Sequence, residues 1–154
     1  MNTTKLNVDI LDCMDALSSA LPKGCRIIDV PVVRDDRGAL SFAEAGKDIP
    51  FDVKRVFWIY DVPGDKRRGG HSHNTCSEVV FAVSGSFTML VDDARGRVGV
   101  RMNVRNKGIV IPAGMWCELC DFAEGTVLVV LASQEYDAKG YTHNYDEFVA
   151  NRRS

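Results

Sequence analysis

The sequence of 154 residues has few histidines, few aromatic residues, no long apolar run and almost no net charge. Histidine occurs three times, and phenylalanine, tryptophan and tyrosine together make up 8% of the chain. Because the 19 basic residues are nearly balanced by 21 acidic ones, we expect neither a nucleic-acid nor a membrane partner. No apolar run approaches the roughly 20 residues that cross a bilayer. The rare histidines are therefore the most informative residues.

The cysteines do not form the pattern of a disulfide scaffold. Their number, five, is odd and their spacing is irregular. The N-terminal segment is interrupted by Asp9, Asp12 and Asp15, which is not the pattern of a signal peptide. We therefore expect a cytoplasmic protein with reduced thiols. Cys117 and Cys120 are three residues apart, so on a strand they face opposite sides and do not predict a redox pair.

Turn residues divide most of the chain into short strands. From residue 25 onward, β-branched and aromatic runs alternate with turns at intervals of about 8–12 residues, which is typical of an all-β sandwich or barrel. We predict strands over 26–33, 39–44, 53–60, 78–83, 86–92, 98–104, 109–112, 115–121 and 126–133, and a short helix over 145–151.

The segment before residue 25 has a different pattern. Apolar residues recur there at helical spacing, at Leu6, Ile10, Met14, Leu17 and Leu21. This spacing predicts a short N-terminal helix. We therefore divide the chain into an N-terminal helical extension, 1–24, and one domain, 25–150, which is long enough for a core.

Two of the three histidines, His71 and His73, lie two residues apart, and Glu78 follows five residues later. Residues i and i+2 of a strand face the same way, so both imidazoles point into one space that Glu78 can join. Such a cluster can hold a metal ion or move protons, and the residues alone leave both alternatives open. Two merely structural histidines are the less favoured interpretation, because such rings are costly to bury.

The pattern His71-x-His73-x4-Glu78-x6-Gly85 resembles the first signature of the cupin superfamily. The segment 108–117 resembles the second, with Cys117 at the usual place of a histidine. Further segments, 37–44, 49–51, 54–56, 66–73, 130–133 and 144–148, resemble the sugar 3,4-ketoisomerases, also called the WxcM-like family. The resemblance implies a cupin double-stranded β-helix (jelly roll), a homodimer with exchanged strands, and no metal or other cofactor.

The resemblance implies isomerisation of a dTDP-linked 4-keto-6-deoxyhexose to the 3-keto sugar, in deoxyamino-sugar and surface polysaccharide biosynthesis. It implies His71 as the base that removes the C3 proton, with His73 beside it, and imidazole suits this task at neutral pH. The substrate-binding residues that we expect from it are Arg37, Arg67, Arg68, Cys117 and Phe57.

Two positions depart from the family pattern. Members often have a tyrosine, proposed as a proton shuttle, at the place of Phe57, and histidine or arginine at the place of Cys117. These departures predict a different product or weaker activity. The alternatives are a metal-dependent cupin enzyme using His71, His73, Glu78 and Cys117, and a non-catalytic sugar-nucleotide-binding cupin. We do not expect His143 in the site, because it is far from the pair in sequence.

Overall fold

The computed structural model describes residues 8–153, and most of its regular structure is β-strand. The strands are β1 (Ile10–Asp12), β2 (Arg26–Asp29), β3 (Val32–Asp35), β4 (Gly38–Ser41), β5 (Arg55–Tyr60), β6 (Arg68–His73), β7 (Glu78–Ser84), β8 (Phe87–Asp92), β9 (Arg97–Met102), β10 (Lys107–Ile111), β11 (Trp116–Cys120), β12 (Val127–Ala132) and β13 (Tyr141–Thr142). The helical elements are two 3-10 turns, Ser18–Ala20 and Ala138–Gly140, and α1 (Tyr145–Arg153).

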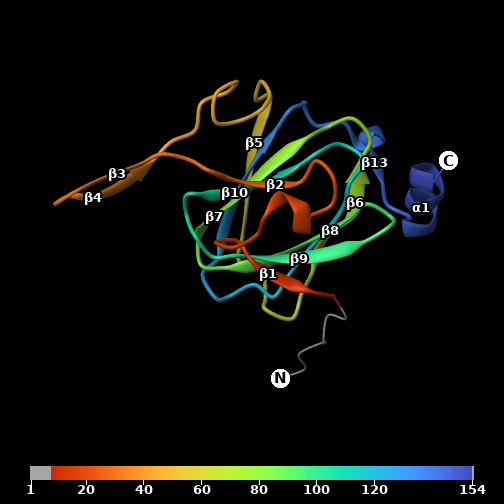
Figure 1. Cartoon of the computed structure of the whole chain (residues 1–154), viewed down its shortest axis with the longest axis horizontal. Coiled ribbons are helices and arrows are strands. Elements are labelled where there is room, and N and C mark those ends of the chain that lie inside the picture. The colour runs from red at the N-terminus through yellow and green to blue at the C-terminus, as the bar shows by residue number, and fades with distance from the viewer. Residues whose placement is uncertain (1–7, 154) are drawn as a thin grey trace.

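Two sheets face each other across the main core (Figure 1). One has the strand order β1-β9-β8-β11-β6-β13, and the other has the order β2-β10-β7-β12-β5. Side chains of both sheets, such as Met89 and Val91 from β8 and Leu128 and Val130 from β12, are buried between them. The prediction of an all-β jelly roll is therefore confirmed, with the expected helix at the C-terminal end present as α1.

The helix predicted before residue 25 is wrong for the described residues, and Leu6 lies outside them. Instead, β1 pairs in parallel with β9, and the other residues between 8 and 24 form only a single 3-10 turn. Ile10 lies opposite Gly99, where an added Cβ would come within 2.3 Å of the Ile10 side chain. The missing side chain at Gly99 makes room for Ile10, so this tertiary contact overrides the helical spacing.

The strand predicted over 26–33 is divided into β2 and β3 by Pro31, which has no N–H to donate to a ladder. β3 and β4 form a separate hairpin that projects from the body of the protein, away from α1 (Figure 1). All eight residues of its two strands are exposed. The hairpin therefore contributes nothing to the core of its own chain.

All five cysteines lie in the described part of the chain, where they are buried and free. Among residues 8–153, no helix is long and apolar enough to span a membrane.

Candidate active site

A cavity of about 230 Å³ lies between the two sheets, beside β6 and β13. Most of the wall surface is apolar, and the polar side chains come from β5, β6, β7, β13 and the loop that contains Tyr136. The lining residues are Arg55, Phe57, Ile59, Arg68, Gly69, His71, His73, Glu78, Val80, Met89, Ile111, Cys117, Leu119, Val130, Tyr136 and Tyr141. An apolar pocket with a few convergent polar groups is the usual form of a small-molecule site.

His71 and His73 both point into this cavity from β6, as their spacing predicts. Their ring centroids are 4.9 Å apart and the rings are nearly perpendicular. The pKa of His71 is lowered from 6.5 to about 4, mainly by burial and to a lesser extent by the neighbouring His73. The His71 ring is therefore neutral at pH 7, so one of its nitrogens is free to accept a proton.

Glu78 joins the pair from the start of β7. Its Oε1 lies 3.0 Å from Nε2 of His73, and both residues are buried, with exposed fractions of 7% and 6%. Because a carboxylate only accepts hydrogen bonds, Nε2 of His73 is the donor, which fixes the ring orientation. The other carboxylate oxygen, Oε2, is buried and has no partner within the described residues.

A β-bulge in β6 decides which arginine faces the cavity. β11 pairs Cys117 with His71 but the next residue, Glu118, with Gly69, so Gly70 is the extra residue. Gly69 and Gly70 have φ of +79° and +76°, and a Cβ on Gly69 would lie 2.8 Å from the carbonyl oxygen of Cys117. Glycine is therefore required at position 69.

The extra residue reverses the alternation of faces along β6. Arg68 consequently lines the cavity, whereas Arg67 lies on the outer face, 3.8 Å from Glu118. The structure thus brings Arg68, but not Arg67, to the histidines. Both had been predicted as substrate-binding residues.

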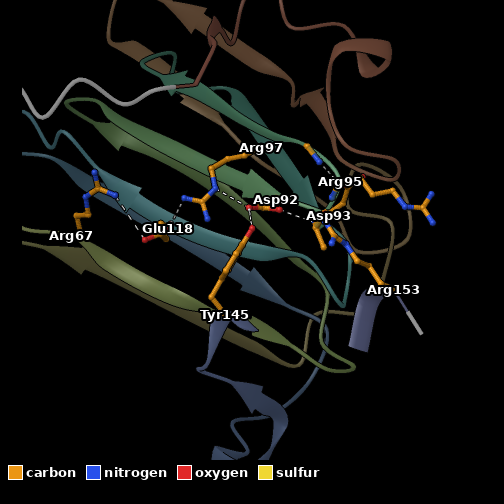
Figure 2. A network of polar contacts seen from close by, with 10 residues as sticks. Arg67, Asp92, Asp93, Arg95, Arg97, Glu118, Tyr145 and Arg153 are labelled. Atoms are coloured by element: carbon orange, nitrogen blue, oxygen red, sulfur yellow. Dashed lines mark hydrogen bonds and ion pairs between the residues drawn. The ribbon is translucent and has the colours of Figure 1, made fainter. Parts of the chain in front are cut away.

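The outer face has its own polar network, shown in Figure 2. Arg97 bonds Glu118 at 2.9 Å and Asp92 at 2.8 Å, and the Tyr145 hydroxyl donates to Asp92 at 2.7 Å. Arg67 joins this network through an ion pair with Glu118. The network connects β6, β8, β9 and β11 with α1, so it stabilises the sheet and its covering helix.

Arg37 is not near the cavity of its own chain. It lies in the turn of the projecting β3–β4 hairpin, where its guanidinium pairs with Asp35 at 2.6 Å and is 86% exposed. Figure 1 shows this hairpin on the side of the molecule away from β6 and β13. A single chain therefore does not assemble Arg37 with the histidines.

Phe57 and Cys117, the two departures from the family pattern, both line the cavity. Burial raises the pKa of the Cys117 thiol well above its ordinary value, and the neighbouring Glu78 raises it further. Trp58 and Tyr60 are 61% and 58% exposed and do not line the cavity, so neither supplies the phenol that is missing at position 57.

Four residues near the histidines were not predicted: Arg55, Tyr136, Tyr141 and His143. Arg55 shares a strand face with Phe57, a signal present in the alternation of β5. Its guanidinium stacks over the Phe57 and Tyr136 rings at 4.8 and 5.4 Å, and its buried Nε has no partner among the described residues.

Tyr141 and His143 reach the site through the C-terminal tail. The Tyr141 ring centroid lies 4.9 Å from that of His71 and 4.5 Å from that of His73. The His143 centroid lies 5.8 Å from that of His71, so His143 is close to the pair in space although it is far in sequence and does not line the cavity. The pairing of β13 with β6 brings the tail here, and a two-residue strand leaves no clear pattern in the sequence.

The donor set of the metal-dependent alternative does not fit a metal ion. His71, His73, Glu78 and Cys117 all line the cavity. However, in the described part of the chain no three histidine, cysteine or acidic side chains are arranged to hold a metal. His73 and Glu78 bond each other, and the raised pKa keeps Cys117 as a thiol rather than the thiolate that binds metals.

This arrangement of paired histidines in a jelly-roll cavity agrees with comparisons to known proteins. The family model described as FdtA, WxcM-like, C-terminal, matches residues 23–153. The chain belongs to this WxcM-like family. The resemblance seen in the sequence is thereby confirmed.

Relatives of known activity share this WxcM-like domain. TDP-4-oxo-6-deoxy-alpha-D-glucose-3,4-oxoisomerase of Aneurinibacillus thermoaerophilus is 33% identical over 123 residues, which are 80% of this chain and 88% of the relative. The structure of the WlaRB TDP-quinovose 3,4-ketoisomerase from Campylobacter jejuni is 38% identical, with a TM-score of 0.82, covering 84% of this chain and 100% of that one.

A third WxcM-like relative is known with a bound nucleotide. The sugar 3,4-ketoisomerase QdtA of Thermoanaerobacterium thermosaccharolyticum, solved in complex with TDP, is 34% identical, with a TM-score of 0.84 over 86% of this chain and 97% of that one. These relatives confirm the predicted enzyme class, a sugar-nucleotide 3,4-ketoisomerase.

Proposed function

We propose that this chain converts TDP-4-keto-6-deoxyglucose to its 3-keto isomer by proton transfer in the β6 cavity. The observation that carries the proposal is the pair of neighbouring histidine rings, one buried and one half-buried, of which the half-buried His71 is held neutral. The relatives named for 3,4-ketoisomerase activity on TDP-sugars support the choice of reaction and nucleotide.

His71 is the proposed base. It takes the proton from C3, and the electron pair of the C–H bond enters an enediolate spanning C3 and C4. A base of low pKa is weak, but the negative charges of a bound nucleotide diphosphate and of the enediolate would raise the pKa of His71 in the complex. His73 lies beside it with its ring oriented by Glu78. Because Nε2 of His73 donates to Glu78, its Nδ1 is the nitrogen left to accept the proton of a sugar hydroxyl.

The cavity is small for a nucleotide sugar. At about 230 Å³ it is below the ~300–1,000 Å³ of pockets that enclose drug-sized ligands. We therefore propose that the hexose enters the cavity and that the nucleotide remains outside, at its mouth. Arg68 and Arg55 line the cavity, and a guanidinium is well suited to a diphosphate. The free Nε of Arg55 is available for such a contact.

We further propose a homodimer. Apolar side chains are exposed on the hairpin, including Val33 and Leu40, and on β5, including Val56 and Trp58. A second copy would cover them, and an exchanged hairpin would place Arg37 near the partner's cavity. Mass measurement by light scattering, with Val33→Asp and Leu40→Asp together expected to give monomers, tests this assembly.

The compartment and the pathway are also proposals. Five free cysteines suit the reducing cytoplasm. A 3-keto sugar nucleotide is suited to amination at C3, which supports a place in deoxyamino-sugar and surface polysaccharide biosynthesis.

The proposed reaction is tested by incubation of the purified protein with TDP-4-keto-6-deoxyglucose in heavy water, followed by NMR of the product. We expect a 3-keto sugar with deuterium in the ring, at the same rate with and without a chelator. A rate that depends on added metal would contradict proton transfer without a metal. Binding of the sugar nucleotide without any ring exchange would instead support the non-catalytic alternative.

A further inference from the structure

The C-terminal tail brings the third histidine of the chain into register with the proposed base. β13 pairs antiparallel with β6, so that Tyr141 lies opposite His73 and Thr142 lies opposite Ser72. One residue further in the same register, His143 comes opposite His71. Because alternate residues share a face, Tyr141 and His143 extend the row of rings that begins with His73 and His71.

The contacts between these rings confirm the arrangement. His143 lies edge-on to His71 at 80°, with 5.8 Å between ring centroids, and stacks on Tyr141 at 6° and 5.6 Å. A rotation of one ring, or a single bridging water, joins two imidazoles at this separation. Burial decreases along the row: His73 is buried, His71 is half-buried and His143 is exposed. The three imidazoles therefore lead from buried Glu78 to solvent.

We propose that His143 acts through His71, exchanging the proton of that base with bulk water during isomerisation. The inference rests on the proposed function. In one turnover C3 loses its proton to His71 and C4 gains a proton from His71, while the proton of the C3 hydroxyl passes to the C4 oxygen. The proton on His71 passes to His143 and then to water, and the reverse transfer reloads His71 with a solvent proton for C4.

Within the described residues, the rest of the cavity wall offers no equal route. Its inner part is aliphatic, and Arg55 and Arg68 do not release protons at neutral pH. Phe57 has no hydroxyl, and the raised pKa of buried Cys117 makes it a slow exchanger. The phenols of Tyr136 and Tyr141 are poorer proton carriers at pH 7 than an exposed imidazole.

The test compares His143→Ala and His143→Gln with wild type, using TDP-4-keto-6-deoxyglucose in heavy water. Glutamine keeps the size of the side chain but cannot relay protons. We expect kcat to fall about 10- to 100-fold in both variants, with KM within about twofold, and a smaller fraction of deuterium at C4. Lys139→Gln, an exposed change on the same tail, is the control and should leave all three values unchanged.

Chemical rescue separates proton exchange from a structural role. Imidazole added to the buffer should restore kcat of His143→Ala several-fold and should not accelerate wild type. A rise in KM alone, an unchanged deuterium fraction, or no rescue would each overturn the inference and point to substrate binding or to tail packing.

A measurement without substrate keeps the inference testable if the sugar is not turned over. NMR of the 15N-labelled protein reports the exchange of the His71 ring N–H with water. We expect this exchange to slow about tenfold or more in both His143 variants and not in Lys139→Gln. Absence of turnover by wild type would refute the proposed function, whereas equal N–H exchange rates would refute the role of His143.

Discussion

The cavity and the outer face of the sheet that contains β6 and β11 both bear arginines and acidic residues, but they differ in how these groups are hydrogen-bonded. On the outer face, Arg97 bonds both Asp92 and Glu118. On the cavity side, Arg55 Nε and Glu78 Oε2 are buried without a partner among the described residues. An unsatisfied buried polar group costs about 1–3 kcal/mol.

This difference in hydrogen bonding separates the part of the molecule that supports the fold from the part that performs the function. The outer network is complete within the chain, so its contribution is to stability. The cavity groups lack hydrogen-bond partners until a polar ligand binds. We therefore assign them to binding and chemistry rather than to stability. A third unsatisfied atom, Trp116 Nε1, lies against Phe148 of α1, and nothing in the structure explains it.

The largest expected effect comes from removing the proposed base. His71→Asn keeps the side chain similar in size and polarity but leaves no base for the C3 proton. We expect kcat to fall by about 10²–10⁴-fold with a nearly unchanged melting temperature. NMR of the product and thermal denaturation check this. Full activity of His71→Asn would contradict the assignment of catalysis to the cavity.

The pH dependence of activity tests whether the cavity lowers the pKa of His71. His71 accepts a proton only when neutral, and its pKa is lowered from 6.5 to about 4, mainly by burial. We expect kcat/KM, which reports the free enzyme, to hold at pH 5 and to fall as pH drops through about 4. An imidazole of pKa 6.5 would be only about 3% neutral at pH 5. A midpoint near 6.5 would contradict the lowered value.

Stability must be followed over the same pH range. The unfolded chain binds a proton on His71 at higher pH than the folded chain does. The free energy of unfolding should therefore decrease as pH falls from about 6.5 to about 4. Melting temperatures at each pH, with His71→Asn as the control that lacks this contribution, separate loss of the fold from loss of the base.

A smaller effect distinguishes the two neighbouring arginines. Arg68→Gln removes a guanidinium from the cavity, and we expect KM for the TDP-sugar to rise about 10-fold. Arg67→Gln removes a half-exposed outer charge 3.8 Å from Glu118, worth at most about 1 kcal/mol of stability, and KM should stay within about twofold. Equal increases in KM for both variants would show that the bulge does not divide their roles.

These arginines also show what the sequence could predict. Most strands between residues 26 and 132 and the shared face of His71 and His73 follow from local periodicity and are confirmed. The strand that bears the two histidines, β6, was not among the predicted strands. Arg68 rather than Arg67 faces the cavity because of a bulge that forms only when β11 pairs with β6. Consecutive glycines before the histidines were its only local sign.

Long-range pairing likewise explains the other differences. His143 and Tyr141 reach the site because the two-residue strand β13 joins the edge of β6, and no local pattern predicts that contact. The N-terminal segment becomes a strand because Gly99 of β9 leaves space for Ile10, a residue far from it in sequence. In both cases a tertiary contact decides the outcome, as expected of short segments with weak propensity.

The smallest expected effect compares one tyrosine from each face. Tyr145→Phe removes an outer hydroxyl that donates to buried Asp92, and we expect about 1 kcal/mol less stability, a melting temperature about 2–4 °C lower, and unchanged kcat. Tyr141→Phe removes a hydroxyl that lines the cavity and lies 3.5 Å from Arg55 Nη2, a long hydrogen bond, so its melting temperature should change less. Activity should fall in Tyr141→Phe alone, because only that phenol faces the substrate. The opposite pattern, an active Tyr141→Phe and an inactive Tyr145→Phe, would mean that the outer network controls the site through α1 and β11 rather than only supporting the fold.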